Sequence, residues 1–285
     1  MREGKPSFTA AAVAAARAVA GVDPVAQGLV DGTLAWLVRM GRTGKGTAAA
    51  LNVATLGLLD HIEMRTRAID AAVHEGIAGG ATQLVILGAG LDARAWRMAD
   101  LCKAHVFEVD HPSTQAFKRA RVGGRQPTAR DVHFVAVDFA RDDLGEALDA
   151  AGHDVDAPTF WIWEGVTMYL PREAVRATLA VVAARSAARS RMAVTYATPE
   201  ATPLGPAAVR VANVAFRVMG EAIVGLIASE DMHADLAAAG FHVIDDTPAP
   251  EWGARYGGKK RRLLLVDERL AVALSDAPTR ASRAA

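Results

Sequence analysis

A short glycine-rich segment, LVILGAGLDAR at residues 84–94, limits the folds that this chain can adopt. Its apolar start is typical of a buried strand, and two glycines follow at once. Glycine permits a tight turn and a close approach of the backbone to a ligand. Open α/β sheets bind ligands beyond the carboxyl ends of such strands, so we predict a nucleotide-like ligand here. The predicted contacts are Gly88, Ala89, Gly90 and Asp92. A turn that only connects two elements is the alternative, since a lone glycine pattern is a weak motif.

Short apolar runs alternate with helical stretches from residue 83 onward. This alternation is typical of βαβ units, in which parallel strands form one sheet with helices on both faces. We therefore predict a Rossmann-like α/β fold with a mostly parallel, seven-stranded sheet. The predicted strands are residues 84–87, 105–109, 133–137, 159–163, 191–196, 241–244 and 262–266.

The segments around this core are predicted to belong to the same domain. Residues 1–80 show no strand pattern and should form a helical N-terminal cover, with Thr9 capping an alanine-rich helix. Apolar residues at helical spacing predict a second helix at residues 58–77. The core should span residues 81–270, with a helical insert at 198–229 before the last two strands. The polar residues 271–285 are predicted to be a frayed tail.

Charge balance restricts the partners of the chain. Lys and Arg together number 32, equal to Asp plus Glu. The chain therefore lacks the strong positive field that would attract nucleic acids or anionic membranes. We expect a small-molecule partner and leave the oligomeric state open. Cys102 is the single cysteine, which excludes an intrachain disulfide and a cysteine-rich zinc site. The alanine-rich start, interrupted by Arg17, does not match a signal peptide, and we expect a cytoplasmic protein without a membrane span.

Acidic residues follow several of the predicted strands. Glu108 and Asp110 lie about 20 residues after the glycines and on the same side of their strand, where a carboxylate can accept from both ribose hydroxyls. The sequence predicts that one of them binds ribose and does not choose between them. Asp138 follows the next strand, well placed to accept from an adenine amino group, with Phe139 beside the ring.

Glu164 follows the very apolar strand TFWIW, where a carboxylate must be paired or must face a ligand. A sulfonium group or the amino group of a methionine moiety would be a natural partner. A carboxylate that only caps the following helix is the alternative.

These features fit a dinucleotide almost as well as a methyl donor, because Gly88, Gly90 and Ala93 also satisfy the dinucleotide-binding fingerprint. Two observations favour the methyl donor. The glycine loop follows about 80 residues of predicted helix, and no second mononucleotide-binding half follows it. An NAD-linked oxidoreductase and a noncatalytic S-adenosylmethionine-binding protein remain the alternatives.

Several segments together resemble the leucine carboxyl methyltransferase family, particularly its bacterial branch of S-adenosylmethionine-dependent O-methyltransferases. The resemblance runs from about residue 7 to residue 196. The segments that carry it are SFTA (7–10), RTRAID (65–70), LGAGLDARAWRM (87–98), FEVDHPSTQAFKR (107–119), AVDF (136–139) and WEGVTMYL (163–170).

The resemblance implies a class I methyltransferase fold that binds S-adenosyl-L-methionine. It implies that Arg65 holds the methionine carboxylate and that Gly88 contacts the cofactor. It also implies that Asp110, rather than Glu108, binds the ribose. Asp138 and Phe139 would flank the adenine, and Glu164 would lie near the methionyl amino group. Arg17 is expected to be unimportant for the cofactor.

The predicted reaction is in-line transfer of a methyl group to a carboxylate or hydroxyl oxygen of a small molecule. A carboxylate acceptor needs no general base, whereas a hydroxyl needs Glu164 or a nearby histidine. Tyr169 and Tyr196 are predicted to lie just beyond strand ends, where their hydroxyls could orient the acceptor, and we name Glu164 and Tyr169 as catalytic candidates. Arg94 could support the loop or the substrate. None of the eight histidines has a spacing that singles it out, so no metal site is predicted.

Overall fold

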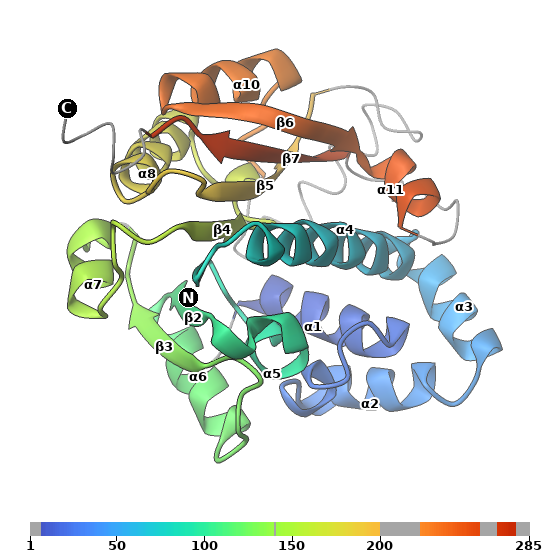
Figure 1. The fold of residues 1–285 in the computed structure, drawn as a ribbon. Coiled ribbons are helices and arrows are strands. Elements are labelled where there is room, and N and C mark those ends of the chain that lie inside the picture. The colour runs from blue at the N-terminus through green and yellow to red at the C-terminus, as the bar shows by residue number, and fades with distance from the viewer. Residues whose placement is uncertain (1–6, 140, 200–222, 257–266, 278–285) are drawn as a thin grey trace, which may run out of the picture.

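The computed structural model describes residues 7–139, 141–199, 223–256 and 267–277 (Figure 1). Its centre is a seven-stranded sheet with the order β3-β2-β1-β4-β5-β7-β6. This confirms the predicted α/β fold and the number of strands. The strands are β1 (Gln83–Leu87), β2 (His105–Asp110), β3 (Asp131–Ala136), β4 (Thr159–Trp163), β5 (Arg191–Ala197), β6 (Phe241–Pro248) and β7 (Glu268–Ser275).

The sheet is mostly parallel, as predicted. Strands β1 to β5 pair in parallel, and β7 is antiparallel to both of its neighbours, β5 and β6. The register aligns the carboxyl ends of β1, β2 and β4, because Leu87 lies opposite both Val109 and Trp163. Side chains that follow these three strands therefore meet at one edge of the sheet.

Helices cover both faces of the sheet. The longer ones are α1 (Phe8–Ala20), α2 (Gly32–Gly41), α3 (Lys45–Ala54), α4 (Leu58–Ala78), α6 (Pro112–Val122), α8 (Arg172–Ala184) and α10 (Ser229–Ala238). The shorter ones are α5 (Arg94–Arg97), α7 (Leu144–Ala150) and α11 (Ala249–Arg255), with 3-10 turns η1 (Ala26–Gly28), η2 (Ala99–Lys103) and η3 (Thr167–Tyr169).

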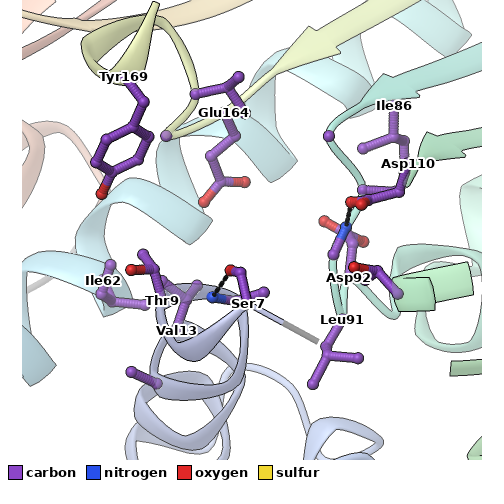
Figure 2. Close-up of a pocket in the computed structure, with 18 of the residues that line it drawn as sticks. Ser7, Thr9, Val13, Ile62, Ile86, Leu91, Asp92, Asp110, Glu164 and Tyr169 are labelled. Carbon is purple, nitrogen blue, oxygen red and sulfur yellow. Dashed lines mark hydrogen bonds between the residues drawn. The ribbon is translucent and has the colours of Figure 1, made fainter. Parts of the chain in front are cut away.

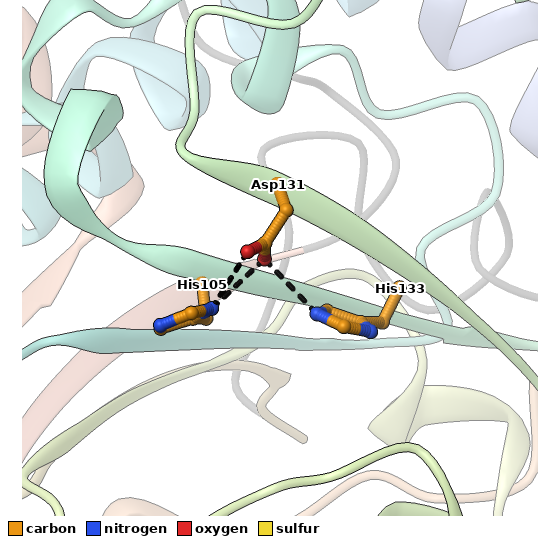
Figure 3. Close-up of side chains that lie close together, drawn as sticks. All are labelled: His105, Asp131 and His133. Carbon is orange, nitrogen blue, oxygen red and sulfur yellow. Dashed lines mark hydrogen bonds and ion pairs between the residues drawn. The ribbon is translucent and has the colours of Figure 1, made fainter.

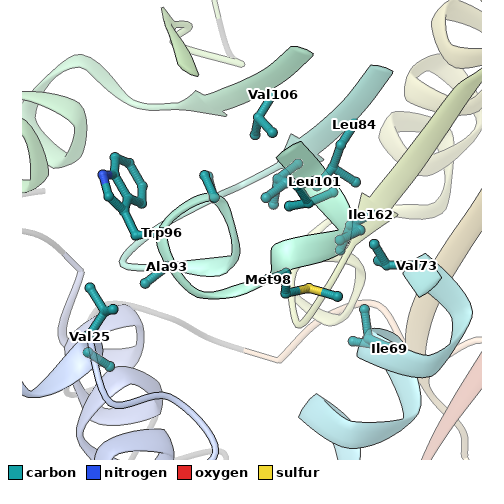
Figure 4. Packing of buried hydrophobic residues seen from close by; sticks show 14 of the residues in the cluster. Val25, Ile69, Val73, Leu84, Ala93, Trp96, Met98, Leu101, Val106 and Ile162 are labelled. Atoms are coloured by element: carbon teal, nitrogen blue, oxygen red, sulfur yellow. The ribbon is translucent and has the colours of Figure 1, made fainter. Parts of the chain in front are cut away.

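Each face of the sheet has its own apolar core, because successive strand residues point to opposite sides. Leu84 and Ile86 of β1 pack with α1, α4 and α5, and Figure 4 shows part of this cluster around Leu84 and Ile162. Val85 and Leu87 pack on the other face with α7, α8 and α10. The two cores hold the strands rigidly, so the loops at the carboxyl edge have a fixed base.

The first 80 residues form the predicted helical cover wherever they are described. Helix α1 begins at Phe8, and its cap is Ser7, whose hydroxyl accepts from the Ala10 N–H at 3.0 Å. The prediction of Thr9 as the cap is therefore wrong by two residues. Helix α4 is the longest in the described part of the chain, with 21 residues that include several charged side chains. No helix among the described ranges combines the length and apolar character needed to cross a bilayer.

The carboxyl-terminal part of the sheet differs from the prediction. The seventh strand is Glu268–Ser275, whereas the predicted strand 262–266 lies outside the described residues. Residues 271–275, predicted to begin the frayed tail, pair with β5 and β6 inside the sheet. The run LAVAL after charged residues is short, and neighbouring strands on both sides stabilise it. Most of the predicted insert is also outside the described residues, and its described end, 223–228, is not helical.

Candidate active site

The described part of the chain contains a cavity of about 540 Å³ at the carboxyl edge of the sheet. Its walls come from the loop after β1, the ends of β2 and β4, and helices α1 and α4 (Figure 2). Cavities of this size commonly hold small molecules, and this edge of a parallel sheet is the usual place for them. The predicted residues that line it are Arg65, Gly88, Ala89, Gly90, Asp92, Asp110, Phe139, Glu164 and Tyr169.

The glycine loop forms one wall of the cavity and packs closely against Val166. Gly88 has a φ of +67° and Gly90 a φ of +51°, a region that other residues rarely adopt. A Cβ atom at Gly88 would lie 2.6 Å from Cγ2 of Val166. The two glycines are therefore needed for the turn and for the close packing of the loop.

Asp110 lies at the end of β2 and faces the cavity. Its carboxylate accepts from the Gly90 N–H at 2.5 Å and from the His111 N–H at 2.6 Å. Burial raises the pKa of Asp110, and the two backbone hydrogen bonds oppose that shift. The Thr114 hydroxyl is a further hydrogen-bond partner of this carboxylate, which thus fixes the glycine loop while it faces the cavity.

Glu108, two residues earlier on the same strand, is not among the residues that line the cavity. It is fully buried, and its Oε2 pairs with Nζ of Lys118 from α6 at 2.5 Å. Burial raises the pKa of Glu108 to about 7, although Lys118 lowers it. The structure therefore separates the two acids that the sequence could not separate: only Asp110 reaches the cavity.

Of the two predicted adenine contacts that follow β3, only Phe139 lines the cavity. Phe139 lines the cavity with 44% of its surface exposed, which leaves its ring available for stacking. Asp138 is not a lining residue, and its backbone N–H donates to Asp142 at 2.8 Å. Asp138 also lies 3.8 Å from the Arg141 guanidinium.

Glu164 lies at the centre of a buried group of arginines. Its Oε1 accepts from Arg17 at 2.6 Å and from Arg65 at 2.9 Å, and its Oε2 accepts from Arg94 at 3.1 Å. Burial alone would raise the pKa of Glu164, but the three guanidinium groups outweigh it and hold the pKa well below the usual value. The carboxylate is therefore ionised, and it faces the cavity.

Arg17 is a part of this site that the sequence prediction missed. It is 4% exposed, lines the cavity and also contacts Asp92 at 3.4 Å. The expectation that Arg17 is unimportant is therefore not supported by its position. The interruption of an alanine-rich helix by one arginine is a signal that could have indicated it, because a buried arginine needs acidic partners.

Arg94 contacts the glycine loop from the side away from the cavity. It is fully buried, is not a lining residue, and contacts Asp92 and, from α4, Asp70 at 2.7 Å. Asp70 also accepts from Arg97 at 2.7 Å and 2.9 Å. Of the two roles considered for Arg94, the structure favours support of the loop.

A second buried group shares Arg65 with the first and adds His61, one helical turn earlier on α4, and Glu268, the first residue of β7. Arg65 donates to both oxygens of Glu268 at 3.1 Å, and Nε2 of His61 lies 2.6 Å from Glu268 Oε2. Burial would raise the pKa of Glu268, but Arg65 and His61 lower it to about 2. All three residues line the cavity. The sequence did not indicate His61 or Glu268, because 207 positions separate them and neither belongs to a recognised motif.

The two tyrosines considered as acceptor-orienting groups have different positions. Tyr169 ends the short turn η3 after β4 and lines the cavity. Tyr196 lies within β5 rather than beyond its end, is fully buried, and donates its hydroxyl to Asp246 at 2.6 Å. The prediction for Tyr196 is therefore wrong, since the strand extends one residue past it.

The strand order and the acids at the strand ends define a class I methyltransferase-like fold. The dinucleotide-binding fold has the order 3-2-1-4-5-6, whereas here the antiparallel β7 lies between β5 and β6. A provisionally named methyltransferase from Thermobifida fusca YX has the same fold, with 15% identity, 96% of each chain covered and a TM-score of 0.62. A DUF574 family protein from Streptomyces avermitilis is similar, with 13% identity, 95% and 98% covered and a TM-score of 0.63.

The chain belongs to the leucine carboxyl methyltransferase family, whose model matches residues 8–183, more than half of the chain. A provisionally named S-adenosyl-L-methionine-dependent methyltransferase of Streptomyces coelicolor is 43% identical over 135 residues, 47% of each chain. One of Mycobacterium sp. (strain JLS) is 38% identical over 207 residues, 66% of each chain. The match thus spans between about half and two thirds of these relatives. The family resemblance of the sequence is confirmed.

Proposed function

We propose that this chain is an S-adenosyl-L-methionine-dependent O-methyltransferase that acts on a small-molecule acceptor. The observation that carries the proposal is a single cavity with two differently lined ends. In Figure 2, Glu164 lies between Asp110 on one side and Tyr169 on the other. The nucleoside would bind at the Asp110 end and the acceptor at the Tyr169 end, so that methyl transfer takes place between them.

The residues at the Asp110 end fit the donor. The Asp110 carboxylate has about four lone-pair sites, and it accepts from two backbone N–H groups and from the Thr114 hydroxyl. A ribose hydroxyl would take the remaining site, and a second one would replace Thr114. The exposed ring of Phe139 would pack against the adenine, and Asp138 precedes it in the chain without lining the cavity. When bound, S-adenosyl-L-methionine supplies an electrophilic methyl group on its sulfonium.

The arginine group around Glu164 would hold the methionine end. The ionised Glu164 would accept from the α-amino group, and Arg65, with Arg17 beside it, would donate to the α-carboxylate. Arg65 already donates to Glu164 and Glu268. Binding would therefore exchange part of these contacts for contacts with the ligand, without leaving a buried charge unpaired.

The Tyr169 end is mainly apolar. Leu58, Ile62, Val13 and Met168 line the cavity, and Figure 2 shows Tyr169 above Ile62 with Thr9 and Val13 nearby. Apolar walls with a few polar groups select organic molecules by shape and orient them by hydrogen bonds. The Tyr169 hydroxyl would orient the acceptor oxygen.

Removal of a proton from a hydroxyl acceptor requires a base, and His61 fits this role better than Glu164. Three guanidinium groups stabilise the charged form of Glu164, which makes it a weak proton acceptor. The ionised Glu268 favours the His61 tautomer with a proton on Nε2, which leaves Nδ1 as the basic nitrogen. We therefore favour a hydroxyl acceptor over a carboxylate, which would need no base.

The test of this function is a methyl-transfer screen with labelled donor, using phenols and benzoic acids of matched size. We expect labelled methyl ethers and stoichiometric S-adenosylhomocysteine. Parallel titrations with S-adenosylhomocysteine and NADH test the ligand independently of the acceptor. Tight binding of NADH alone would overturn the proposal. Binding of S-adenosylhomocysteine without any turnover on the panel or on cell extracts would favour a noncatalytic binding protein.

The base is tested by His61→Gln, which removes the imidazole from the wall of the cavity. We expect the turnover of a phenol to fall by about 100-fold or more, while the affinity for S-adenosylhomocysteine stays the same. His74→Gln is the control, because His74 lies on the same helix with 63% of its side chain exposed. An equal loss of turnover and cofactor affinity would show that His61 only positions Arg65.

A further inference from the structure

Two histidines and an aspartate meet at the opposite edge of the sheet, where the strands begin. His105 is the first residue of β2 and Asp131 the first residue of β3, and His133 follows two residues later. His105 pairs with Asp131 in the register, and alternate residues of a strand share a face. All three side chains therefore project from the same face of two adjacent strands.

Their ligating atoms are close together. Nδ1 of His105 lies 2.8 Å from Asp131 Oδ2, and Nε2 of His133 lies 3.0 Å from Asp131 Oδ1. One such atom from each residue forms a group in which all lie within 4.8 Å of one another. Figure 3 shows the carboxylate between the two imidazole rings.

These separations are close to those that a metal ion imposes. Ligand atoms about 2.1 Å from a tetrahedral Zn²⁺ ion lie about 3.4 Å apart. The atoms lie within 4.8 Å of one another, so rotation of these partly exposed side chains would bring all three around one ion. The hydrogen-bonding protons between the groups would be released as the metal binds.

The surroundings favour a cation and keep the site accessible. Among the residues that the structure describes, no lysine or arginine forms an ion pair with Asp131. Between 34% and 40% of each of the three side chains is exposed, so an ion can enter and keep water ligands. The His133 ring stacks on Phe107 with a centroid distance of 4.7 Å, which fixes its orientation.

We propose that His105, Asp131 and His133 form a site for a divalent transition-metal ion such as Zn²⁺. Two imidazoles and one carboxylate with open positions are a recurrent ligand set for such ions, unlike the all-oxygen sets of Mg²⁺ and Ca²⁺. The site is about one strand length, roughly 17 Å, from the cavity. Its metal links the edge strand β3 to β2 and takes no part in methyl transfer.

The experiment titrates tag-free, chelator-treated protein with ZnCl₂ at pH 7.5 by calorimetry and follows thermal unfolding. We expect one equivalent of Zn²⁺ to bind with a Kd in the micromolar range or below and to raise the Tm. The His105→Gln/His133→Gln double variant should bind Zn²⁺ at least tenfold more weakly than the parent. The Tm of the metal-free double variant should match that of the metal-free parent, because both side chains are partly exposed.

Two controls separate this site from ordinary surface binding. His242 also lies against a single carboxylate, at 2.5 Å from Asp276, and is 52% exposed, so His242→Gln should leave Zn²⁺ binding unchanged. Cys102 is an exposed thiol, and Cys102→Ser should likewise bind one equivalent. The proposal is overturned if the parent shows no saturable binding below about 100 µM, or if the double variant binds as tightly as the parent.

Discussion

The two ends of the parallel sheet hold charged side chains in different ways. At the carboxyl edge, Glu164 is 7% exposed in its side chain and is shared by three arginines. At the amino edge, the Asp131 side chain is 40% exposed and contacts two imidazoles. Both edges belong to the same strands and the same apolar cores, so the difference comes from what covers them. Helices α1 and α4 cover the carboxyl edge.

This comparison indicates what each edge can do. A buried charge is tolerated only with several partners, so the carboxyl edge holds a fixed arrangement that is already organised for a charged ligand. A half-exposed carboxylate between imidazoles has solvent as an alternative partner, so the amino edge can bind or release an ion with small changes. Substitutions at the first edge should therefore have large effects on stability, and those at the second edge small ones.

The largest effect is expected for Glu164→Ala. The substitution leaves Arg17, Arg65 and Arg94 without a shared buried partner, and we expect the free energy of unfolding to fall by about 3–5 kcal/mol. Urea unfolding followed by circular dichroism measures it. The matched control is Glu63→Gln on α4, whose partner Arg67 is 44% exposed and where we expect about 0.5 kcal/mol or less. Similar losses in both variants would contradict the comparison.

The second effect concerns pH and Glu268. Its pKa is about 2 in the folded protein, below the ordinary value of 4.5, so its contribution to stability is complete above about pH 4.5. The contribution is lost as the pH falls from about 4.5 towards 2, and it is on the order of 3 kcal/mol. The difference in unfolding free energy between the parent and Glu268→Gln should therefore shrink on acidification. A difference that stays constant from pH 7 to 3.5 would show that the carboxylate charge does not stabilise the fold.

A smaller effect separates Asp110 from Glu108. Asp110→Ala should weaken S-adenosylhomocysteine binding at least tenfold, or about 1.4 kcal/mol, because the ribose hydroxyls lose a charged acceptor. Glu108→Gln should leave this affinity nearly unchanged, since Glu108 lies outside the cavity and pairs with Lys118. Calorimetric titration of both variants measures the difference. Equal affinities for the two variants would remove Asp110 from the proposed ribose site.

The fold was predictable from the sequence because the spacing of apolar residues within each segment indicates whether that segment is a helix or a strand. The glycine turn after β1 and the six strands before β7 follow the alternation expected for βαβ units. The strand at 268–275 was not predicted, because these residues start with charged side chains and acquire strand structure from pairing with β5 and β6. Strand formation that depends on pairing with distant segments leaves no clear pattern in the sequence of the strand itself.

The site was predictable in part, for a related reason. Gly88, Asp110 and Glu164 directly follow strands, and the register of a parallel sheet brings such positions together. Arg17 on α1 and His61 on α4 reach the same cavity from the N-terminal cover. Their positions depend on the packing of α1 against α4 and of α4 against β7, which no local pattern encodes. The His105–Asp131–His133 group depends in the same way on the register of two strands 26 residues apart.

The smallest expected effect is at the amino edge. In metal-free protein at pH 7.5, Asp131→Asn should change the free energy of unfolding by less than about 1 kcal/mol, because solvent already screens the carboxylate and an amide can still hydrogen-bond to the imidazoles. Glu164→Gln, an equally conservative change, should cost clearly more in the same urea titration, since three buried arginines lose their counter-charge. If Asp131→Asn proved the more damaging of the two, exposure would not be the property that distinguishes the edges, and the amino edge would have to be regarded as a structural element of the sheet rather than an accessible ion site.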